Sequence, residues 1–482
     1  MKLFQYLICL SYIVNISFNH ILNEQDISED IKYLIFSFNR NLTIKESFKS
    51  EEILKELFYN QIYINIKVGS QKKDIPFYLY LEQYSLAIES KNVSTDQVKG
   101  IYDESESNTY EDLKESEPPF IVGDISKAIL SKDIFYFNND GIQSFINFYL
   151  CKENHDNTHI TEGGKIGFKL NSIYAESEKS SFITNLKQNK LISSSIFSFK
   201  YDSKNFDEET GKLYIGSYPH LIDKIHYKEE YYNHDNSQVI YPGMEWNYLF
   251  DEIKISDDYN IESNKAYFYF EIGFILGTKK YFNYIKSLDT YKEYFENNNK
   301  CQQIQFSIND LEANDVEPQL ADDYTAYRCN KDVDVKKINI GNLLFIKKTK
   351  EIIFNLTDSD LWIEKNGYKY FLILEKKYYN DVWCFGKPIF KKYSMVFDID
   401  NKQIGFYTQL LEDDSQDNSQ DNNSNNNKSQ TFIYVIIIIG LVIIIIGLAF
   451  FLVKCYINLP RKKRANEMLD DNYDYNGEKI NN

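Results

Sequence analysis

At 482 residues the chain is long enough for two large lobes with appendages. Aromatic residues make up 16% of it, with only 8 Pro and 19 Gly, which argues against a fibrous or wholly disordered chain. The formal net charge of −17 argues against nucleic acid as a partner, because phosphate binding needs clustered Lys and Arg.

The first 57 residues contain two predicted parts. Residues 1–20 begin with Lys2 and a short apolar run, which is the outline of a secretory signal peptide. The N-terminal segment at residues 21–57 carries more acidic than basic residues. The apolar positions near its end, at residues 51–58, predict an amphipathic helix that leads into the first folded part of the chain.

Two apolar runs with the periodicity of strands follow. The first has apolar residues at every second position, at Ile62, Ile64, Ile66 and Val68. Gly69 and Ser70 interrupt the alternation, and a second apolar run extends to Ile88. Two strands separated by a polar turn predict a β-hairpin.

Five segments along the chain occur in an order known from one peptidase family. They are the hairpin at 58–88, YDESESNTYEDL at 102–113, SSFITNLKQNKLISSSIFSFKY at 180–201, GKLYIG at 211–216, and WCFGKPIFKKYSMVFDIDNKQIGF at 383–406. In this order they resemble the pepsin-like aspartic peptidases, over roughly residues 58–410. The resemblance implies a mostly β, bilobal fold with a central cleft, an N-terminal lobe at 58–203 and a C-terminal lobe at 204–410.

Other segments resemble the working parts of that family, with departures. Residues 120–133 resemble the flap hairpin, in which Gly123 matches the family. Val122 stands where the family has a tyrosine, so the hydroxyl that normally overhangs the substrate is missing. Residues 165–167 and 384–386 resemble the two segments, each ending in glycine, that thread a lobe behind its catalytic loop.

The catalytic positions of the family hold tyrosine in this chain. Aspartic peptidases hold a water between two aspartates that share a proton, one acting as base and one as acid. Counting from the turn glycine Gly69 places Tyr80 at the first of these positions, and fixing Gly277 on a family glycine places Tyr269 at the second. A phenol with a pKa of about 10 cannot serve as a general base at acidic to neutral pH.

A gapped alignment offers an alternative pair of carboxylates, Glu82 and Glu271. It needs a deletion in each catalytic loop, and the longer glutamate side chain would move both carboxylates out of register with a shared water. We prefer the interpretation in which Tyr80 and Tyr269 fill the space vacated by the two aspartates.

Cysteines and sequons both fit an oxidising secretory compartment. The resemblance implies a disulfide between Cys301 and Cys329. Cys151 and Cys384 pair with one another or remain buried and free, because four cysteines allow three connectivities. Asn-X-Ser/Thr sequons that predict glycosylated surface loops stand at Asn41, Asn92 and Asn355.

The end of the chain predicts a membrane anchor. Residues 411–430 have almost no apolar residue and predict a flexible low-complexity stalk. Residues 431–453 carry no charge and are long enough to cross about 30 Å of hydrocarbon as one helix. The basic residues of the tail at 454–482 place that tail in the cytoplasm. We therefore expect a single-pass protein of the secretory pathway or cell surface, with its N-terminal bulk extracellular or lumenal.

Two functions from different classes remain. We favour a catalytically inactive, membrane-anchored member that uses its cleft to bind a peptide or protein. The alternative is an active membrane-anchored aspartic endopeptidase that uses Glu82 and Glu271. We expect no cofactor and no metal, since His155 and His159 are spaced like metal ligands but lie in a loop-like stretch.

Overall fold

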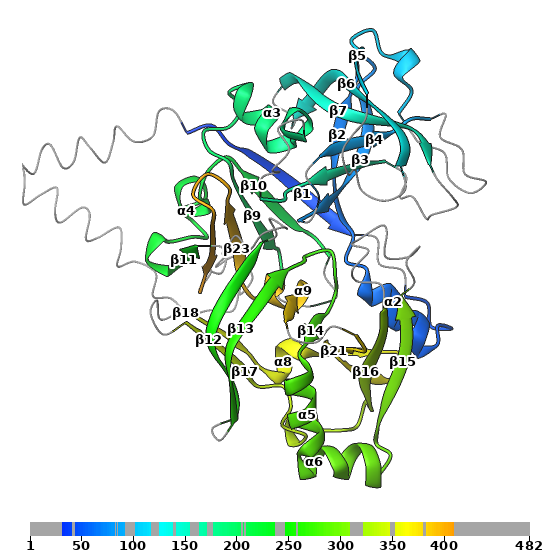
Figure 1. The fold of residues 1–482 in the computed structure, drawn as a ribbon, viewed down its shortest axis with the longest axis vertical. Helices are drawn as coiled ribbons and strands as arrows, with labels where there is room; N and C mark the ends of the chain where they lie inside the picture. The colour runs from blue at the N-terminus through cyan, green and yellow to red at the C-terminus, as the bar shows by residue number, and fades with distance from the viewer. Residues whose placement is uncertain are drawn as a thin grey trace, which may run out of the picture. The chain divides into compact units, whose positions relative to one another are not determined.

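The computed structural model describes residues 31–40, 44–81, 83, 85–91, 102–116, 125–137, 141–154, 163–170, 177–203, 206, 209–236, 246–256, 259–308, 322–347, 352–378 and 382–408 (Figure 1). The predicted signal peptide, stalk, membrane segment and tail lie outside these residues, as do Val122, Gly123 and Glu82. Within the described part of the chain, no helix is long and apolar enough to cross a membrane.

The chain is mostly β, as expected, and its strands form two large sheets. The first sheet has the order β11-β24-β23-β9-β10-β1-β2-β3-β8-β4-β7-β6-β5. Its strands are β1 (Leu34–Arg40), β2 (Ile62–Val68), β3 (Lys73–Tyr80), β4 (Leu86–Glu89), β5 (Glu111–Ser116), β6 (Ile125–Phe137), β7 (Ile142–Asn154), β8 (Gly164–Gly167), β9 (Ile196–Tyr201), β10 (Gly211–Ile215), β11 (Tyr232–Asn236), β23 (Ser394–Asp398) and β24 (Gln403–Tyr407).

The second sheet is built from the later part of the chain. Its order is β18-β17-β12-β13-β22-β14-β21-β16-β20-β19, and β15 pairs with β16. Its strands are β12 (Asn247–Ser256), β13 (Tyr259–Phe268), β14 (Ile275–Gly277), β15 (Cys301–Ile308), β16 (Asp322–Asn330), β17 (Leu343–Lys347), β18 (Ile352–Leu356), β19 (Trp362–Lys365), β20 (Tyr368–Phe371), β21 (Ile373–Lys376) and β22 (Trp383–Phe385).

Helices are few and short among the described residues. They are α2 (Ser50–Phe58), α3 (Phe182–Gln188), α4 (Pro219–Ile222), α5 (Lys279–Ser287), α6 (Asp289–Tyr291), α8 (Asp358–Leu361) and α9 (Lys387–Lys392). The amphipathic helix predicted at 51–58 is confirmed as α2. Its apolar face is buried at Ile53, Leu54, Leu57 and Phe58, and Figure 1 shows α2 beside β15 of the second sheet.

The predicted hairpin is confirmed over residues 62–80 as β2 and β3, but the end of the second apolar run forms a separate strand, β4, which pairs with β7 and β8. The four alternating residues Ile62, Ile64, Ile66 and Val68 are all buried, whereas the positions between them are partly or fully exposed. The two strands pair antiparallel, with Val68 opposite Lys73. Gly69 begins the turn with a φ of +76°, a conformation in which glycine has no steric cost.

The first sheet also contains strands from both ends of the described chain. β1, from the N-terminal segment, pairs antiparallel with β10 and with β2. β23 and β24 follow α9 near the C-terminal end, and β23 pairs with β9. Residues of the N-terminal segment therefore form part of the sheet that carries the predicted first lobe.

The disulfide expected from the family resemblance is confirmed. Cys301 and Cys329 lie opposite one another on the antiparallel strands β15 and β16 and are bonded. Cys151 is buried and Cys384 is partly buried, and no disulfide joins them. Of the two alternatives for these cysteines, the one without a disulfide is observed.

Candidate functional site

Each sheet contains one motif in which two strands flank a third strand that runs between them. In the first sheet, β3 and β4 flank β8, with β3 parallel and β4 antiparallel to it. Tyr80 ends β3 opposite Gly167, and the amide of Phe168 donates to the Tyr80 carbonyl oxygen over 2.8 Å. Ala87, on the returning strand, lies opposite Lys165. We call residues 81–85, which join β3 to β4, the first loop.

The second sheet repeats the arrangement with β13, β14 and β22. Phe268 ends β13 opposite Phe385, and the amide of Tyr269 donates to the Phe385 carbonyl oxygen over 2.9 Å. On the returning strand, Leu276 lies opposite Cys384. We call residues 269–274, which join β13 to β14, the second loop.

The strand registers make Tyr80 and Tyr269 equivalent positions. The spacing is seven residues both from Tyr80 to Ala87 and from Tyr269 to Leu276. Each returning residue also lies opposite the residue two positions before a glycine, which is Gly167 in the first motif and Gly386 in the second. Both motifs therefore have the same register and the same spacing from the tyrosine to the returning residue. By the same count along the sequence, Glu82 corresponds to Glu271.

Both tyrosines are buried, but their surroundings differ. Tyr80 is 1% exposed, and the Nζ of Lys165 lies 5.8 Å from the centre of its ring. Tyr269 is 3% exposed and belongs to an apolar cluster that includes Ile272 and Phe274. A buried aromatic ring occupies the equivalent position in each motif.

Glu271 joins the two loops. Its side chain is 1% exposed, and Oε1 accepts a hydrogen bond from the backbone amide of Leu81 in the first loop. Loops that belong to two different sheets therefore meet at one carboxylate. Glu82, the other member of the predicted carboxylate pair, lies outside the described residues.

Residues 58–60, which follow the N-terminal segment, also contact the second loop. The amide of Asn60 donates to the Glu271 carbonyl oxygen over 2.7 Å, and the amide of Gly273 donates to the Phe58 carbonyl oxygen over 2.8 Å. The side-chain amide of Asn60 donates to the Phe270 carbonyl oxygen over 2.6 Å. A Cβ at Gly273 would lie 1.8 Å from the carbonyl oxygen of Leu57, so this approach requires glycine.

A family model described as eukaryotic aspartyl protease matches residues 61–409, which include both motifs. The chain belongs to the eukaryotic aspartyl protease family. No curated protein matches the chain.

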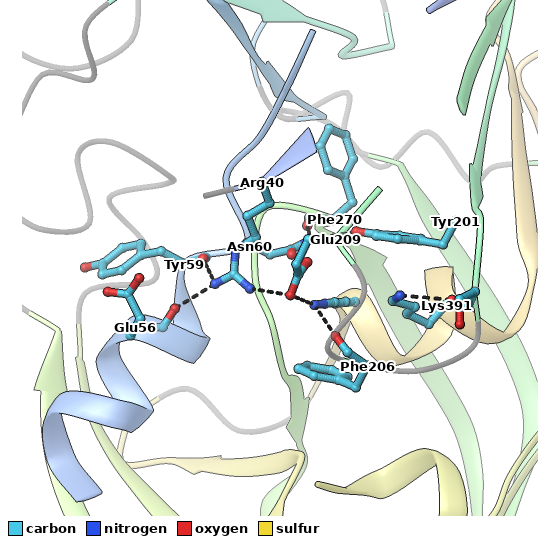
Figure 2. A network of polar contacts seen from close by, with 11 residues as sticks. Arg40, Glu56, Tyr59, Asn60, Tyr201, Phe206, Glu209, Phe270 and Lys391 are labelled. Atoms are coloured by element: carbon cyan, nitrogen blue, oxygen red, sulfur yellow. Dashed lines mark hydrogen bonds and ion pairs between the residues drawn. The ribbon is translucent and has the colours of Figure 1, made fainter. Parts of the chain in front are cut away.

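A buried charged cluster lies beside the second loop of this aspartyl protease family member (Figure 2). The Nζ of Lys387, which is fully buried, donates to Glu209 Oε1 and to the Phe206 carbonyl oxygen, the latter over 2.9 Å. Arg40 Nη1 lies 3.1 Å from the same oxygen of Glu209. Lys391, on the same helix as Lys387, donates to a backbone carbonyl oxygen over 2.9 Å.

The sequence analysis missed this cluster, although one signal for Lys387 was present. The closing segment of the family has the pattern I-L-G-D, and in CFGK the residue after Gly386 is lysine. A lysine where the family has an aspartate indicates that the partner of this residue is acidic. Glu209 is that partner, but it is 178 residues away along the chain, so no local pattern points to it.

The remaining predicted site residues are distributed as follows. The flap residues Val122 and Gly123, the sequons at Asn41 and Asn92, and the histidines His155 and His159 lie outside the described residues. Asn355 is exposed on β18, and its backbone amide donates to the hydroxyl of Tyr393 over 2.8 Å. The described part of the chain contains no group of three or more His, Cys, Asp or Glu placed to hold a metal ion.

Proposed function

We propose that the protein is a catalytically inactive aspartyl protease homologue that binds a peptide or protein between its two lobes. The observation that supports this proposal is the equivalence of Tyr80 and Tyr269 in the two motifs. These are the positions at which sequence comparison with the family expects the two aspartates. A pair of phenols offers no carboxylate that can share a proton across a bound water.

The chemistry of the phenol supports inactivity. A general base must be deprotonated at the working pH, and an ordinary tyrosine with a pKa of about 10 is neutral from about pH 3 to 7. Both rings are also almost completely buried. Binding does not need the aspartates, because burial of apolar surface and backbone hydrogen bonds supply affinity in such sites.

The location of the protein is part of the same proposal. The apolar run at residues 1–20 and the uncharged residues 431–453 support entry into the secretory pathway and anchoring by one C-terminal helix. The disulfide between Cys301 and Cys329 is consistent with an oxidising compartment. The exposed position of Asn355 is consistent with glycosylation there.

The alternative is an active membrane-anchored endopeptidase that uses Glu82 and Glu271. One observation favours it, namely that the carboxylate of Glu271 lies where the two loops meet. The same hydrogen bond also argues against it, because Oε1 already accepts the amide of Leu81 and the side chain is buried. A carboxylate fixed in this way is a structural acceptor and is poorly placed to activate a water.

A library assay on the full-length chain separates the two functions. Purified protein is incubated with a diverse peptide library from about pH 3 to 7, with and without a hydroxyl-bearing transition-state analogue, and products are read by mass spectrometry. We expect no inhibitor-sensitive cleavage from wild type. Inhibitor-sensitive cleavage that is lost in Glu82→Gln or Glu271→Gln would establish the active alternative.

Binding is measured in the same experiment. Uncleaved peptides retained by the immobilised native chain are eluted and identified, and the thermally unfolded chain serves as the control. We expect a set of peptides enriched on the native chain only. Equal recovery from the native and unfolded chains would contradict the binding function.

A further inference from the structure

The cluster around Glu209 connects two sets of contacts to the second loop, which we call the two arms; Figure 2 shows the cluster. Lys387 and Arg40 share one carboxylate oxygen, Glu209 Oε1. Among the described residues, the other oxygen, Oε2, has no hydrogen-bond partner and is buried. One carboxylate oxygen therefore fixes two cations that come from distant parts of the chain.

The first arm runs from Lys387 directly into the second loop. The backbone amide of Lys387 donates to the Ile272 carbonyl oxygen over 2.8 Å. Gly386, just before it, has no room for a side chain, since an added Cβ would lie 2.4 Å from that same oxygen. A displacement of Lys387 is therefore transmitted to the loop through backbone contacts.

The second arm runs from Arg40 through the N-terminal segment. Arg40 Nη2 donates to the carbonyl oxygens of Glu56 and Tyr59, the first over 2.7 Å. The backbone amide of the next residue, Asn60, donates to the Glu271 carbonyl oxygen. Arg40 therefore fixes the position of residues that contact the second loop. Glu209 contacts Lys387 in the first arm and Arg40 in the second, so its carboxylate connects the two arms.

The surroundings of Lys387 disfavour the protonated, charged form of its side chain. Burial, the nearby Arg40 and the nearby Lys391 lower its pKa, whereas Glu209 raises it, and the result falls from the ordinary 10.5 to about 7. Glu209 is the carboxylate that faces Lys387 within the described part of the chain. Asp207 and Glu208, its neighbours in sequence, lie outside the described residues.

We propose that the protonation state of Lys387 controls how firmly the second loop is held against residues 58–60. When Lys387 is neutral, the cluster contains one anion, Glu209, and two cations, Arg40 and Lys391. Its net positive charge is then smaller than when Lys387 is charged. With Lys387 charged, an additional buried cation shares the same carboxylate oxygen, which favours opening of the contact. The inference depends on the proposed function only for its consequence, which is that ligand binding at this loop would vary with pH.

The direction of the effect follows from linkage. If opening returns Lys387 to water, the open state binds its proton up to about pH 10.5 and the closed state only up to about 7. Opening is therefore favoured as the pH falls through this window and levels off below about 7. Between about pH 8 and about pH 6, the opening equilibrium constant should rise about tenfold.

Hydrogen exchange of the full-length protein tests this inference without any ligand. Protection of the amides in residues 269–277 is measured at about pH 6 and about pH 8 and corrected for the intrinsic pH dependence of exchange. We expect about tenfold greater protection at the higher pH. Equal corrected protection at both values would overturn the proposal.

Two variants with opposite effects make the test specific. Lys387→Met removes the titrating group, so protection should no longer change with pH. Lys387→Arg keeps a charge throughout, so protection at about pH 8 should fall to the wild-type level at about pH 6. If Lys387→Met does not fold, Lys387→Arg and the pH dependence of protection in the wild type still test the proposal.

A lysine in another ion pair provides the matched control. Lys286 lies 2.7 Å from Glu375 Oε2, but its side chain is 35% exposed. Lys286→Met should leave the pH dependence of residues 269–277 unchanged. Loss of the dependence in this variant as well would show that it arises elsewhere. If hydrogen exchange of the loop depends on pH but the protein retains no peptide, the proposed function fails and this inference stands.

Discussion

The backbone amide of Leu81 donates a hydrogen bond to the carboxylate of Glu271, across the junction between the two sheets. The two residues are 190 positions apart in sequence, and Glu271 is 1% exposed. A buried amide that lost this acceptor would be left unsatisfied, so the contact matters for stability. The first and second loops are therefore joined by a structural contact in this chain.

Replacing Glu271 should destabilise the fold in proportion to the acceptor that is lost. Glu271→Ala leaves the Leu81 amide without this buried acceptor, which costs about 1–3 kcal/mol. Glu271→Gln keeps an acceptor oxygen in place and should cost less. The measurement is urea unfolding of both variants, with the slope of free energy against urea as a check on two-state behaviour. Equal stability of the two variants would contradict the structural role.

A second prediction concerns the fully buried Asp133 in the first sheet. Its carboxylate accepts hydrogen bonds from the hydroxyls of Tyr102 and Thr109, each over 2.5 Å, and from the amide of Ile134. Burial and the bond to Asp133 hold the pKa of Tyr102 well above its ordinary value, so this hydroxyl remains a donor. Tyr102→Phe removes a donor to a charged group and should cost about 1.5–3 kcal/mol.

Tyr110 provides the comparison for that substitution. Its hydroxyl lies 3.0 Å from the hydroxyl of Ser131, a neutral partner. Tyr110→Phe should therefore cost only about 0.5–1.5 kcal/mol. Thermal unfolding of the two variants under identical conditions gives the order, and a larger loss for Tyr110→Phe would show that charge at Asp133 does not dominate.

The disulfide should contribute measurably to stability. It closes a loop between positions separated by 28 residues, and the chain-entropy model gives about 3 to 4 kcal/mol for a loop of this size. The double variant Cys301→Ser, Cys329→Ser should therefore unfold at a lower temperature than wild type and should no longer respond to reductant. Cys384→Ser, which leaves the bridge intact, should keep the response.

Part of the fold was predictable because its signals are local. The alternation from Ile62 to Val68 and the turn at Gly69 specify β2, the turn and β3 within 20 residues, and the apolar spacing at 51–58 specifies α2. The order of segments along the chain indicated the family. Each of these signals is carried by neighbouring residues, which is why they could be found without the structure.

The features that were missed depend on distant partners. The sequence analysis predicted no strand at Leu34–Arg40, although its residues alternate between buried and partly or fully exposed positions as in a strand, and its partner β10 is about 175 residues away. The contact of Leu81 with Glu271 and the pairing of Lys387 with Glu209 are likewise non-local. No periodicity reports which side chains meet across two sheets.

The last prediction concerns the buried thiol of Cys151. Burial raises the pKa of this thiol from its ordinary 9.0 to about 12, with a further increase from the nearby Glu89 and a smaller opposing effect of Lys165. Because the folded state holds the proton more tightly than the unfolded state, this group stabilises the fold below about pH 9 and loses that contribution as the pH rises toward 12. The thiolate is the reactive form, so alkylation of Cys151 in the native protein at about pH 9 should be slowed by about a thousandfold or more. Mass spectrometry of chains treated with iodoacetamide, native and in urea, measures this directly, with the partly buried Cys384 as the internal comparison. Rapid labelling of native Cys151 at that pH would show that the strand β7 opens to solvent, and the burial assigned to it here would be wrong.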